Sequence, residues 1–334
     1  MAEVMLRVIM PNWQEYYGGR FIEQGVVPGF HPVAIGRANF DDYFSQNNGD
    51  FRTRIRINSF NLRNDEPVEK ANDAIWVIGD SITFGWGVER NETYTQVVAD
   101  QLGTPTYNIA APSADVCGYQ ALVRRMPSAV KPRAAIVGLV LENDLLKYES
   151  CAPSESPTQP AAPPAQINLS VGELKLFLTE HLALYNFWAV ALKRISVVNE
   201  TLIRLGLVER EHAFRLHLPP DELDDRIQGT TRALQRLRGM MPTAATFTVL
   251  IVPARFEIRD DNAFFRSVRE RMVQALQDAG IDVVDPFLRF RQQGFAGTHL
   301  AHDGHWSPAG HRLAGEELSV RLRGTGTTPA APAK

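Results

Sequence analysis

The residues of this chain that could do chemistry lie in three short segments far apart in the sequence. Ser81 follows the apolar run 75–78 in the segment IWVIGDSITFGWG, a pattern typical of a buried strand that ends in a tight turn. A serine at a strand-to-helix turn can expose its oxygen and direct its own backbone N–H at a substrate. Asn143, after a second apolar run, and the pair Asp303 and His305 near the C-terminus are residue types that complement such a serine.

The elements that must position these residues are indicated by alternating apolar runs and helical stretches from residue 74 onward. Strands are predicted at 75–78, 106–109, 135–141, 247–252 and 281–284, and helices notably at 92–102, 118–127, 262–279 and 308–322. Such alternation is typical of a parallel sheet covered by helices on both faces. Because ligands bind at the carboxyl ends of the strands in such sheets, we expect Ser81, Asn143 and the 108–115 loop to meet in one crevice.

The chain is predicted to have three parts. Residues 1–73 indicate strands and turns, and so a small β-rich N-terminal subdomain. Within it, residues 52–58 alternate with period two, after the turn signal Asn-Asn-Gly-Asp at 47–50. An α/β domain is predicted at 74–323, and a disordered tail at 324–334.

Residues 151–240 are predicted to interrupt the α/β domain as a linker and helical insertion. The Pro-, Ser- and Ala-rich stretch 151–166 should be a mobile connector. Residues 174–195 are apolar and aromatic, and a helix packed on the core is the favoured interpretation because amphipathic core helices are common. The alternatives are a lid over the crevice and a surface that contacts lipid.

Composition and charge exclude some classes of protein. The chain has 334 residues, 44% of them hydrophobic and 22% charged, which is ordinary for a globular protein. A net charge of −3 gives no reason to expect nucleic acid as a partner. Neither a signal-peptide core nor a membrane-spanning window is evident. The compartment stays open: cytoplasmic for the chain as written, periplasmic or membrane-anchored if its N-terminus is truncated.

Metal and cofactor binding are not indicated. The chain has two cysteines, Cys117 and Cys151, and no CxxC, which argues against a metal cage. A disulfide between them is conceivable, but two partly buried thiols are the favoured interpretation. The GWG at 85–87 lacks the full dinucleotide-binding spacing, and no GK[ST] phosphate loop is present. We therefore expect no metal and no organic cofactor.

Four motifs stand in one order along the chain: GDSITFG (79–85), YNIAAPSAD (107–115), LENDL (141–145) and DGHWSPAGH (303–311). In this set the chain resembles the SGNH, or GDSL, hydrolase superfamily of serine esterases, lipases and carbohydrate acyl-ester enzymes, over roughly residues 74–323. The resemblance implies a flavodoxin-like, three-layer α/β/α fold with a parallel sheet. The stretch NGDFRTRIRINSFNLR also resembles the β-rich leader of some bacterial members.

The resemblance also implies roles for individual residues. Ser81 would be the nucleophile, His305 the general base, and Asp303 the carboxylate that orients His305. Backbone N–H groups of Ser81 and Ser113 and the side-chain amide of Asn143 would bind the oxyanion. The chemistry needs these types because a serine hydroxyl is a weak nucleophile without a base, the base must be held in one tautomer, and the oxyanion needs preorganised donors.

Two positions depart from the family pattern. Ser113 stands five residues after Asn108, where a glycine is usual, and it can offer its N–H provided that no positive φ is needed. The terminal motif is Asp303-Gly304-His305 instead of Asp-x-x-His, a spacing also seen in relatives that resemble alginate acetylation proteins. Gly304 is expected to give this loop the freedom that so short a link needs.

Purely structural roles are the alternative for the serine and the asparagine. Ser81 could be only a turn or N-cap serine, and Asn143, with Asp144, could cap a following helix. For both Ser81 and Asn143 the chemical role is favoured. Asp80 is expected to brace the turn.

The histidines near the C-terminus admit a rival interpretation. His299, His302 and His311 crowd the loop that contains His305, and His311 is expected to be structural. A metal site built from Asp303, His305 and His311 is possible in principle, but it is disfavoured because no further ligand set is evident.

The leading hypothesis is a serine esterase that cleaves an acetyl or longer acyl ester of a small molecule, carbohydrate or lipid through an acyl-enzyme. One alternative is a carbohydrate O-acyltransferase that uses the same residues. A second is a catalytically silent binding module on the same fold. A third is a lipase that contacts a membrane surface through 174–195, which is not favoured.

Overall fold

The computed structural model describes residues 1–46, 49–145, 150–152, 177–194, 201, 204, 218–243 and 245–324. The predicted connector beyond residue 152, the start of the apolar segment at 174–176 and the predicted tail beyond residue 324 lie outside these residues.

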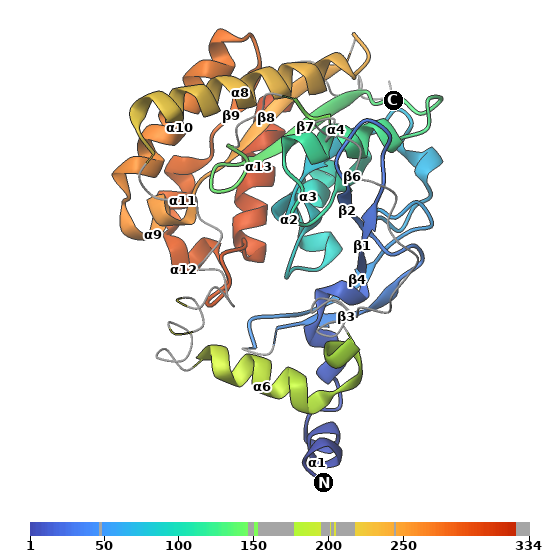
Figure 1. The fold of residues 1–334 in the computed structure, drawn as a ribbon. Coiled ribbons are helices and arrows are strands. Elements are labelled where there is room, and N and C mark those ends of the chain that lie inside the picture. Colours follow the sequence, from blue (N-terminus) through green and yellow to red (C-terminus); the bar gives the residue numbers. More distant parts are fainter. Residues whose placement is uncertain are drawn as a thin grey trace, which may run out of the picture.

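A five-stranded parallel sheet forms the centre of the molecule (Figure 1), with the strand order β6-β5-β7-β8-β9. The strands are β5 (Ile75–Gly79), β6 (Thr106–Ala110), β7 (Ala134–Val140), β8 (Thr246–Val252) and β9 (Asp282–Val284). All neighbouring pairs are parallel. The predicted sheet is confirmed, and its strands lie close to their predicted bounds.

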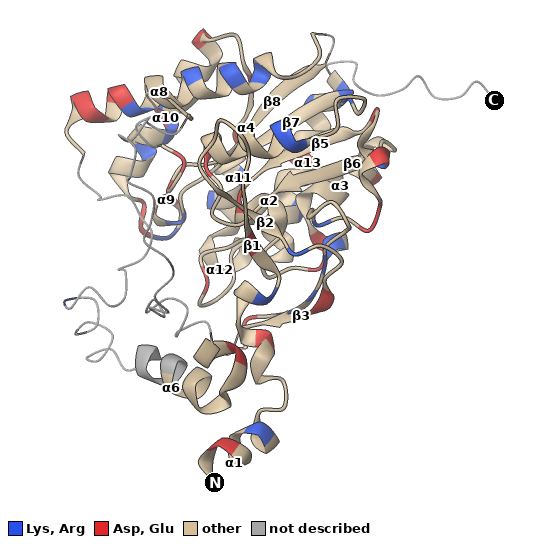
Figure 2. Ribbon diagram, turned by 45° about the vertical axis from the view of Figure 1, so that its right-hand side comes forward, with Lys and Arg blue, Asp and Glu red and all other residues tan. Residues whose placement is uncertain are grey.

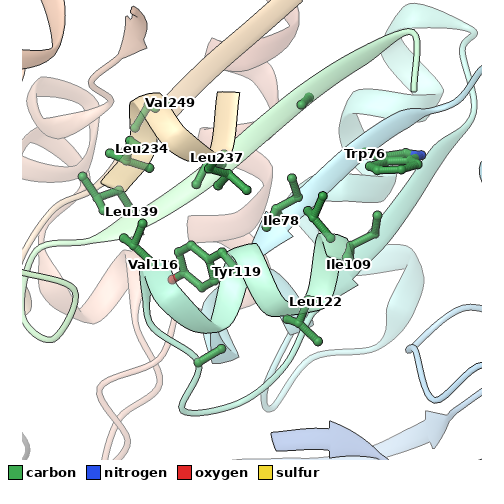
Figure 3. Packing of buried hydrophobic residues seen from close by; sticks show 14 of the residues in the cluster. Trp76, Ile78, Ile109, Val116, Tyr119, Leu122, Leu139, Leu234, Leu237 and Val249 are labelled. Atoms are coloured by element: carbon green, nitrogen blue, oxygen red, sulfur yellow. The ribbon is translucent and has the colours of Figure 1, made fainter. Parts of the chain in front are cut away.

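Helices cover both faces of this sheet. One face packs against α4 (Val116–Arg125), α8 (Pro220–Gly239) and α10 (Ala263–Asp278), and the other against α3 (Tyr94–Leu102), α11 (Phe287–Gln293) and α13 (Pro308–Gly324). Side chains alternate between faces along a strand, so Ile78 of β5 belongs to the first cluster and Val77 to the second. The three-layer α/β/α fold is thus confirmed. Figure 3 shows the first cluster, in which strand residues Ile78, Ile109, Leu139 and Val249 meet helix residues Tyr119, Leu122, Leu234 and Leu237.

Short elements connect these layers. They are α2 (Ser81–Phe84), α9 (Arg255–Asp260), α12 (Phe295–Thr298) and the 3-10 turns η3 (Val68–Ala71) and η4 (Arg90–Glu92).

The N-terminal region contains two antiparallel strand pairs but does not begin with a strand. The pairs are β1 (Ile22–Gly25) with β2 (Val33–Gly36), and β3 (Asp41–Ser45) with β4 (Arg52–Arg56). They follow α1 (Ala2–Ile9) and the 3-10 turns η1 (Trp13–Tyr16) and η2 (Gly18–Arg20). The prediction of strands and turns throughout 1–73 therefore missed α1, in which Glu3 and Arg7 form an ion pair four residues apart.

The described part of the apolar segment packs on this N-terminal region and not on the sheet. Its helix α6 (Ala183–Arg194) begins where Glu3 accepts hydrogen bonds from the backbone N–H groups of Ala183 and Leu184, at 3.0 and 2.8 Å. Figures 1 and 2 both show α1 and α6 together at the end of the molecule away from α8. The predicted packing on the core is therefore wrong about the partner: the described part of α6 contacts α1 and η1. Phe187 and Trp188 of α6 are exposed.

Cys117 and Cys151 form a disulfide, so the favoured interpretation of two thiols is wrong. Their Cα atoms are 5.1 Å apart, within the range that a disulfide allows. The bond ties α4 to the segment that follows β7. Two cysteines separated by 34 positions carry no local signal of pairing, and only the fold brings them together.

Charged side chains of both signs lie near one another on β4 and its neighbouring strand, and both signs occur on α8. Arg54 and Arg56 of β4 both pair with Asp41 on the neighbouring strand, in line with the solvated strand face expected for them. In Figure 2, α8 carries acidic residues in its first turn and basic residues in its last.

Among the described residues, no helix is long and apolar enough to cross a membrane.

Candidate active site

Ser81 lies at the junction of β5 and α2, at the carboxyl end of the sheet. β5 ends at Gly79, and Asp80 caps α2 by accepting a hydrogen bond from the backbone N–H of Ile82 at 2.9 Å. Asp80 is buried, and burial raises the pKa of its carboxyl despite hydrogen bonds that lower it. The expected brace of the turn is therefore present, and it leaves the Ser81 hydroxyl directed at the crevice.

Gly79 and Thr83 of the GDSITFG segment pack closely against each other. A Cβ added to Gly79 would lie 2.0 Å from Oγ1 of Thr83, and one added to Gly138 on β7 would lie 2.5 Å from the same atom. Thr83 is fully buried, and its hydroxyl is 2.8 Å from that of Tyr94. The side-chain amide of Asn108 donates to the Thr83 carbonyl at 2.7 Å. Two strands without side chains at these positions therefore let α2 sit directly on the sheet.

Ser81, His305 and Asp303 lie in direct contact. The Nε2 atom of His305 is 2.8 Å from Ser81 Oγ, and its Nδ1 atom hydrogen-bonds Asp303 Oδ1. The backbone N–H of His305 donates to the same carboxylate oxygen at 3.0 Å. With Nδ1–H donating to the carboxylate, Nε2 is left to accept the proton of the serine hydroxyl.

Asp303 is held as a carboxylate. Its side chain is only 10% exposed, and burial alone would raise its pKa, but hydrogen bonds from His305 and from Gln46 outweigh that effect and lower the pKa below its usual value. Nε2 of Gln46 donates to Asp303 Oδ2. Gln46 is a contact that the sequence analysis missed, since no local pattern marks a glutamine 257 positions away as a partner.

Asn143 lies in a turn after β7, close to Ser81. Its side-chain Nδ2 is 3.4 Å from Oδ2 of Asp80, a long contact that leaves the amide available to a ligand. Residues 141–144 form turns, and the Asp144 carboxylate accepts from the Tyr119 hydroxyl and the Val140 N–H, both at 2.8 Å. Asp144 thus stabilises the turn that contains Asn143.

Ser113 adopts the conformation that its identity disfavours. Its φ is 64°, in the left-handed region, so the proviso that it needs no positive φ is not met. A residue with a Cβ loses about 1–2 kcal/mol in this region relative to glycine. Ser113 nevertheless lies on the same cavity as Ser81 and Asn143.

A cavity of about 620 Å³ collects the predicted residues at the carboxyl end of the sheet, a size that suits a small organic ligand. Its walls include Ser81, Ser113, Asn143, Asp303 and His305. Further residues that the sequence analysis did not propose also line it: Trp86, Glu142, Arg255, His299, His302 and Trp306. The described residues of α6 do not contribute to this lining, so they give no support to a lid.

Gly304 is needed for close approach and not for backbone freedom. It is not among the residues with positive φ, and a Cβ there would lie 2.0 Å from a guanidinium nitrogen of Arg255. Arg255 is fixed by Glu142, with Nε 3.1 Å from Oε2 and its backbone N–H 2.5 Å from Oε1. The expected role of Gly304 is therefore corrected: it lets an ion-paired arginine lie over the Asp303–His305 link.

The other histidines differ from His305 in their surroundings. Burial lowers the pKa of His299 and of His311 to about 3, so both stay neutral. His311 accepts the backbone N–H of Tyr94 at 3.2 Å, the structural role expected for it. Within the described residues, no group of three or more His, Cys, Asp or Glu is placed to hold a metal ion.

Fold and site together define an α/β/α protein with a Ser–His–Asp arrangement at the carboxyl end of a parallel sheet. The chain belongs to the GDSL-like lipase/acylhydrolase family, whose sequence profile matches residues 77–313. The resemblance to SGNH hydrolases is thereby confirmed, and the protein is a GDSL-family acylhydrolase of the esterase and lipase type.

Two solved structures illustrate what this chain is similar to. One is a member of the lipolytic protein G-D-S-L family from Veillonella parvula, with 13% identity, a TM-score of 0.41, and coverage of 75% of this chain and 98% of that one. Another is the acetyl xylan esterase AlAXEase, with 10% identity, a TM-score of 0.41, and coverage of 75% and 99%. No curated protein matches the sequence of this chain.

Proposed function

We propose that the protein is a serine esterase that hydrolyses a carboxylic ester, with an acetyl or longer acyl group, through an acyl-enzyme intermediate. The observation that carries this proposal is the continuous contact from Ser81 Oγ through the imidazole of His305 to Asp303, on the wall of a cavity of about 620 Å³. The substrate class is an ester of a small molecule, carbohydrate or lipid.

In the first half-reaction, Ser81 Oγ attacks the ester carbonyl while Nε2 of His305 accepts its proton. The carboxylate of Asp303 stabilises the imidazolium that forms. Collapse of the tetrahedral intermediate breaks the bond to the alcohol oxygen, which takes the proton from His305 and leaves. Water, activated by the same nitrogen, then attacks the acyl group on Ser81 and releases the acid.

Oxyanion binding is assigned to the backbone N–H groups of Ser81 and Ser113 and to the side-chain amide of Asn143. The first lies at the start of α2, where backbone N–H groups have no partner within the helix. Among the described residues, the amide of Asn143 makes a 3.4 Å contact to Asp80, which it would give up when substrate binds. Loss of one such donor typically lowers turnover by about 10²–10³.

The proposal is tested by hydrolysis of a p-nitrophenyl ester series by wild type, Ser81→Ala and His305→Ala. We expect either substitution to lower kcat by at least about 10³, because each removes a group on which the acyl transfer depends. Ser128→Ala, at an exposed serine, is the matched control and should keep wild-type activity. A fluorophosphonate probe should label wild type and not Ser81→Ala. Undiminished hydrolysis by folded Ser81→Ala would end the esterase proposal.

A further inference from the structure

The loop 299–306, which carries Asp303 and His305, rests on the β3–β4 hairpin of the N-terminal region. An isolated antiparallel bridge between His299 and Trp306 closes the base of this loop. Leu300 is 8% exposed and packs in one apolar cluster with Phe44 of β3 and Phe51, which directly precedes β4. The base of the loop is therefore anchored on the hairpin by apolar contacts.

A second contact anchors the loop one residue before Asp303. The carboxylate of Asp50 accepts hydrogen bonds from the backbone N–H of His302 at 2.8 Å and from its Nδ1 at 2.6 Å. The Asp50 side chain is 3% exposed whereas that of His302 is 64% exposed. The buried partner thus belongs to the hairpin, and it fixes the backbone from which Asp303 projects.

The third contact follows from the short Asp303-Gly304-His305 link. Because a single residue separates Asp303 from His305, one oxygen of the Asp303 carboxylate accepts two hydrogen bonds from His305. The donors are the ring Nδ1 and the backbone N–H. The other oxygen points away from the histidine in a nearly buried site, where an acceptor without a donor is costly. Gln46, at the end of β3, supplies that donor.

The fourth contact covers the imidazole. Trp86 stacks on His305, with ring centroids 5.7 Å apart and an interplanar angle of 26°. Trp86 in turn lies edge-on against Phe44 of β3 at 4.6 Å and near Phe21 at 6.0 Å. An aromatic face favours a cation, so this packing favours the imidazolium that the proposed reaction forms.

We propose that Gln46 is a positioning residue that acts through Asp303 on His305, so that the β3–β4 hairpin completes the active site. The hairpin lies outside residues 77–313, which the family profile matches. Its part in catalysis rests on the proposed function, whereas its coupling to the His305 imidazole does not. The N-terminal region is, on this proposal, an integral part of the site and not a separate appendage.

Two substitutions at Gln46 test this coupling. Gln46→Met keeps the length of the side chain but removes the donor, and we expect kcat for p-nitrophenyl acetate to fall about tenfold because the imidazole loses its alignment. KM should stay within about twofold, since Gln46 is not on the cavity wall. Gln46→Lys keeps a donor and adds a positive charge beside Asp303. The acidic limb of the kcat/KM profile should then move to lower pH, because the added positive charge lies beside the carboxylate that stabilises the imidazolium.

The matched controls are Gln24→Met and Gln24→Lys, at an exposed glutamine on β1 of the same region. Neither should change kcat or move the profile. NMR without substrate should show a changed resonance for the Nδ1 proton of His305 in Gln46→Lys and not in Gln24→Lys, because Nδ1 hydrogen-bonds the Asp303 carboxylate that Gln46 contacts. This readout stands even if the esterase proposal fails. The proposal is overturned if folded Gln46→Met keeps kcat within twofold of wild type, or if the His305 Nδ1 proton resonance is the same in wild type and Gln46→Lys.

Discussion

At the scale of single residues, Ser113 combines a required backbone geometry with an unfavourable side chain. Its φ of 64° is a glycine-like conformation, and the position borders the cavity beside Ser81. If only its N–H binds the oxyanion, the side chain is dispensable and the conformation is not. Replacement by glycine and by a β-branched residue should therefore separate the two requirements.

We expect Ser113→Gly to keep kcat/KM within about threefold of wild type, because the N–H remains and glycine adopts positive φ without a steric cost. Its free energy of unfolding should be unchanged or higher by up to about 1 kcal/mol, since the relief of strain offsets the greater entropy of the unfolded chain.

Ser113→Val is the opposing variant, because a β-branched residue at positive φ forces the loop to shift. Its kcat should fall by about 10² or more, as after loss of one oxyanion donor. Steady-state kinetics and urea denaturation measure both effects. Wild-type kcat in folded Ser113→Val would contradict the assignment of this N–H to the oxyanion.

At the scale of elements, the packing of α2 against the sheet depends on two glycines. Gly79 of β5 and Gly138 of β7 both face Thr83, and a Cβ on Gly138 would also lie 2.9 Å from the Tyr94 hydroxyl. Since α2 begins with Ser81, any displacement of α2 moves the proposed nucleophile relative to His305. Packing between β7 and α2 thus bears on activity as well as stability.

Gly138→Ala is expected to lower the free energy of unfolding by about 1–3 kcal/mol, because it overpacks a buried contact. It should also reduce kcat, by displacing Ser81. Gly239→Ala in α8 is the control: a Cβ there meets no described atom within 4 Å, and alanine is favoured over glycine in a helix. Thermal and urea denaturation with an ester assay measure these effects. Equal stability of Gly138→Ala and wild type would show that the layers tolerate a methyl group here.

At the scale of the whole molecule, a covalent bond and a set of contacts join segments that are remote in sequence. The Cys117–Cys151 disulfide closes a loop of 34 positions between α4 and the segment after β7. The β3–β4 hairpin, by contrast, contacts the 299–306 loop through noncovalent interactions, which include those of Gln46 and Asp50.

Reduction of the disulfide is expected to lower the free energy of unfolding by about 3–4 kcal/mol, the loop-closure value for this separation. The double variant Cys117→Ser/Cys151→Ser should unfold at the same urea concentration as the reduced wild type, and should not respond to reductant. Urea denaturation with and without a reductant makes the comparison. If the midpoint for wild type did not change on reduction, the cross-link would contribute nothing to stability.

The sequence by itself determined the α/β fold class, the strands from β5 to β9 and the residues worth testing. These follow from local signals: apolar runs, turn residues after strands, and the Asp303-Gly304-His305 spacing. Ser81, Asn143 and His305 could be named because the motifs around them resemble those of SGNH hydrolases. That local basis also explains why the parallel sheet and its helices were easier to predict than the start of the chain.

Only the tertiary structure decided the pairing of Cys117 with Cys151, the left-handed conformation of Ser113, and the position of Arg255 over Gly304. It alone placed α6 on α1 and Gln46 against Asp303. The physical reason is the same in each case: these features depend on contacts between segments whose order along the chain carries no information about their distance in space. A pattern can predict a strand or a turn, but it cannot say which side chain will meet a given carboxylate oxygen.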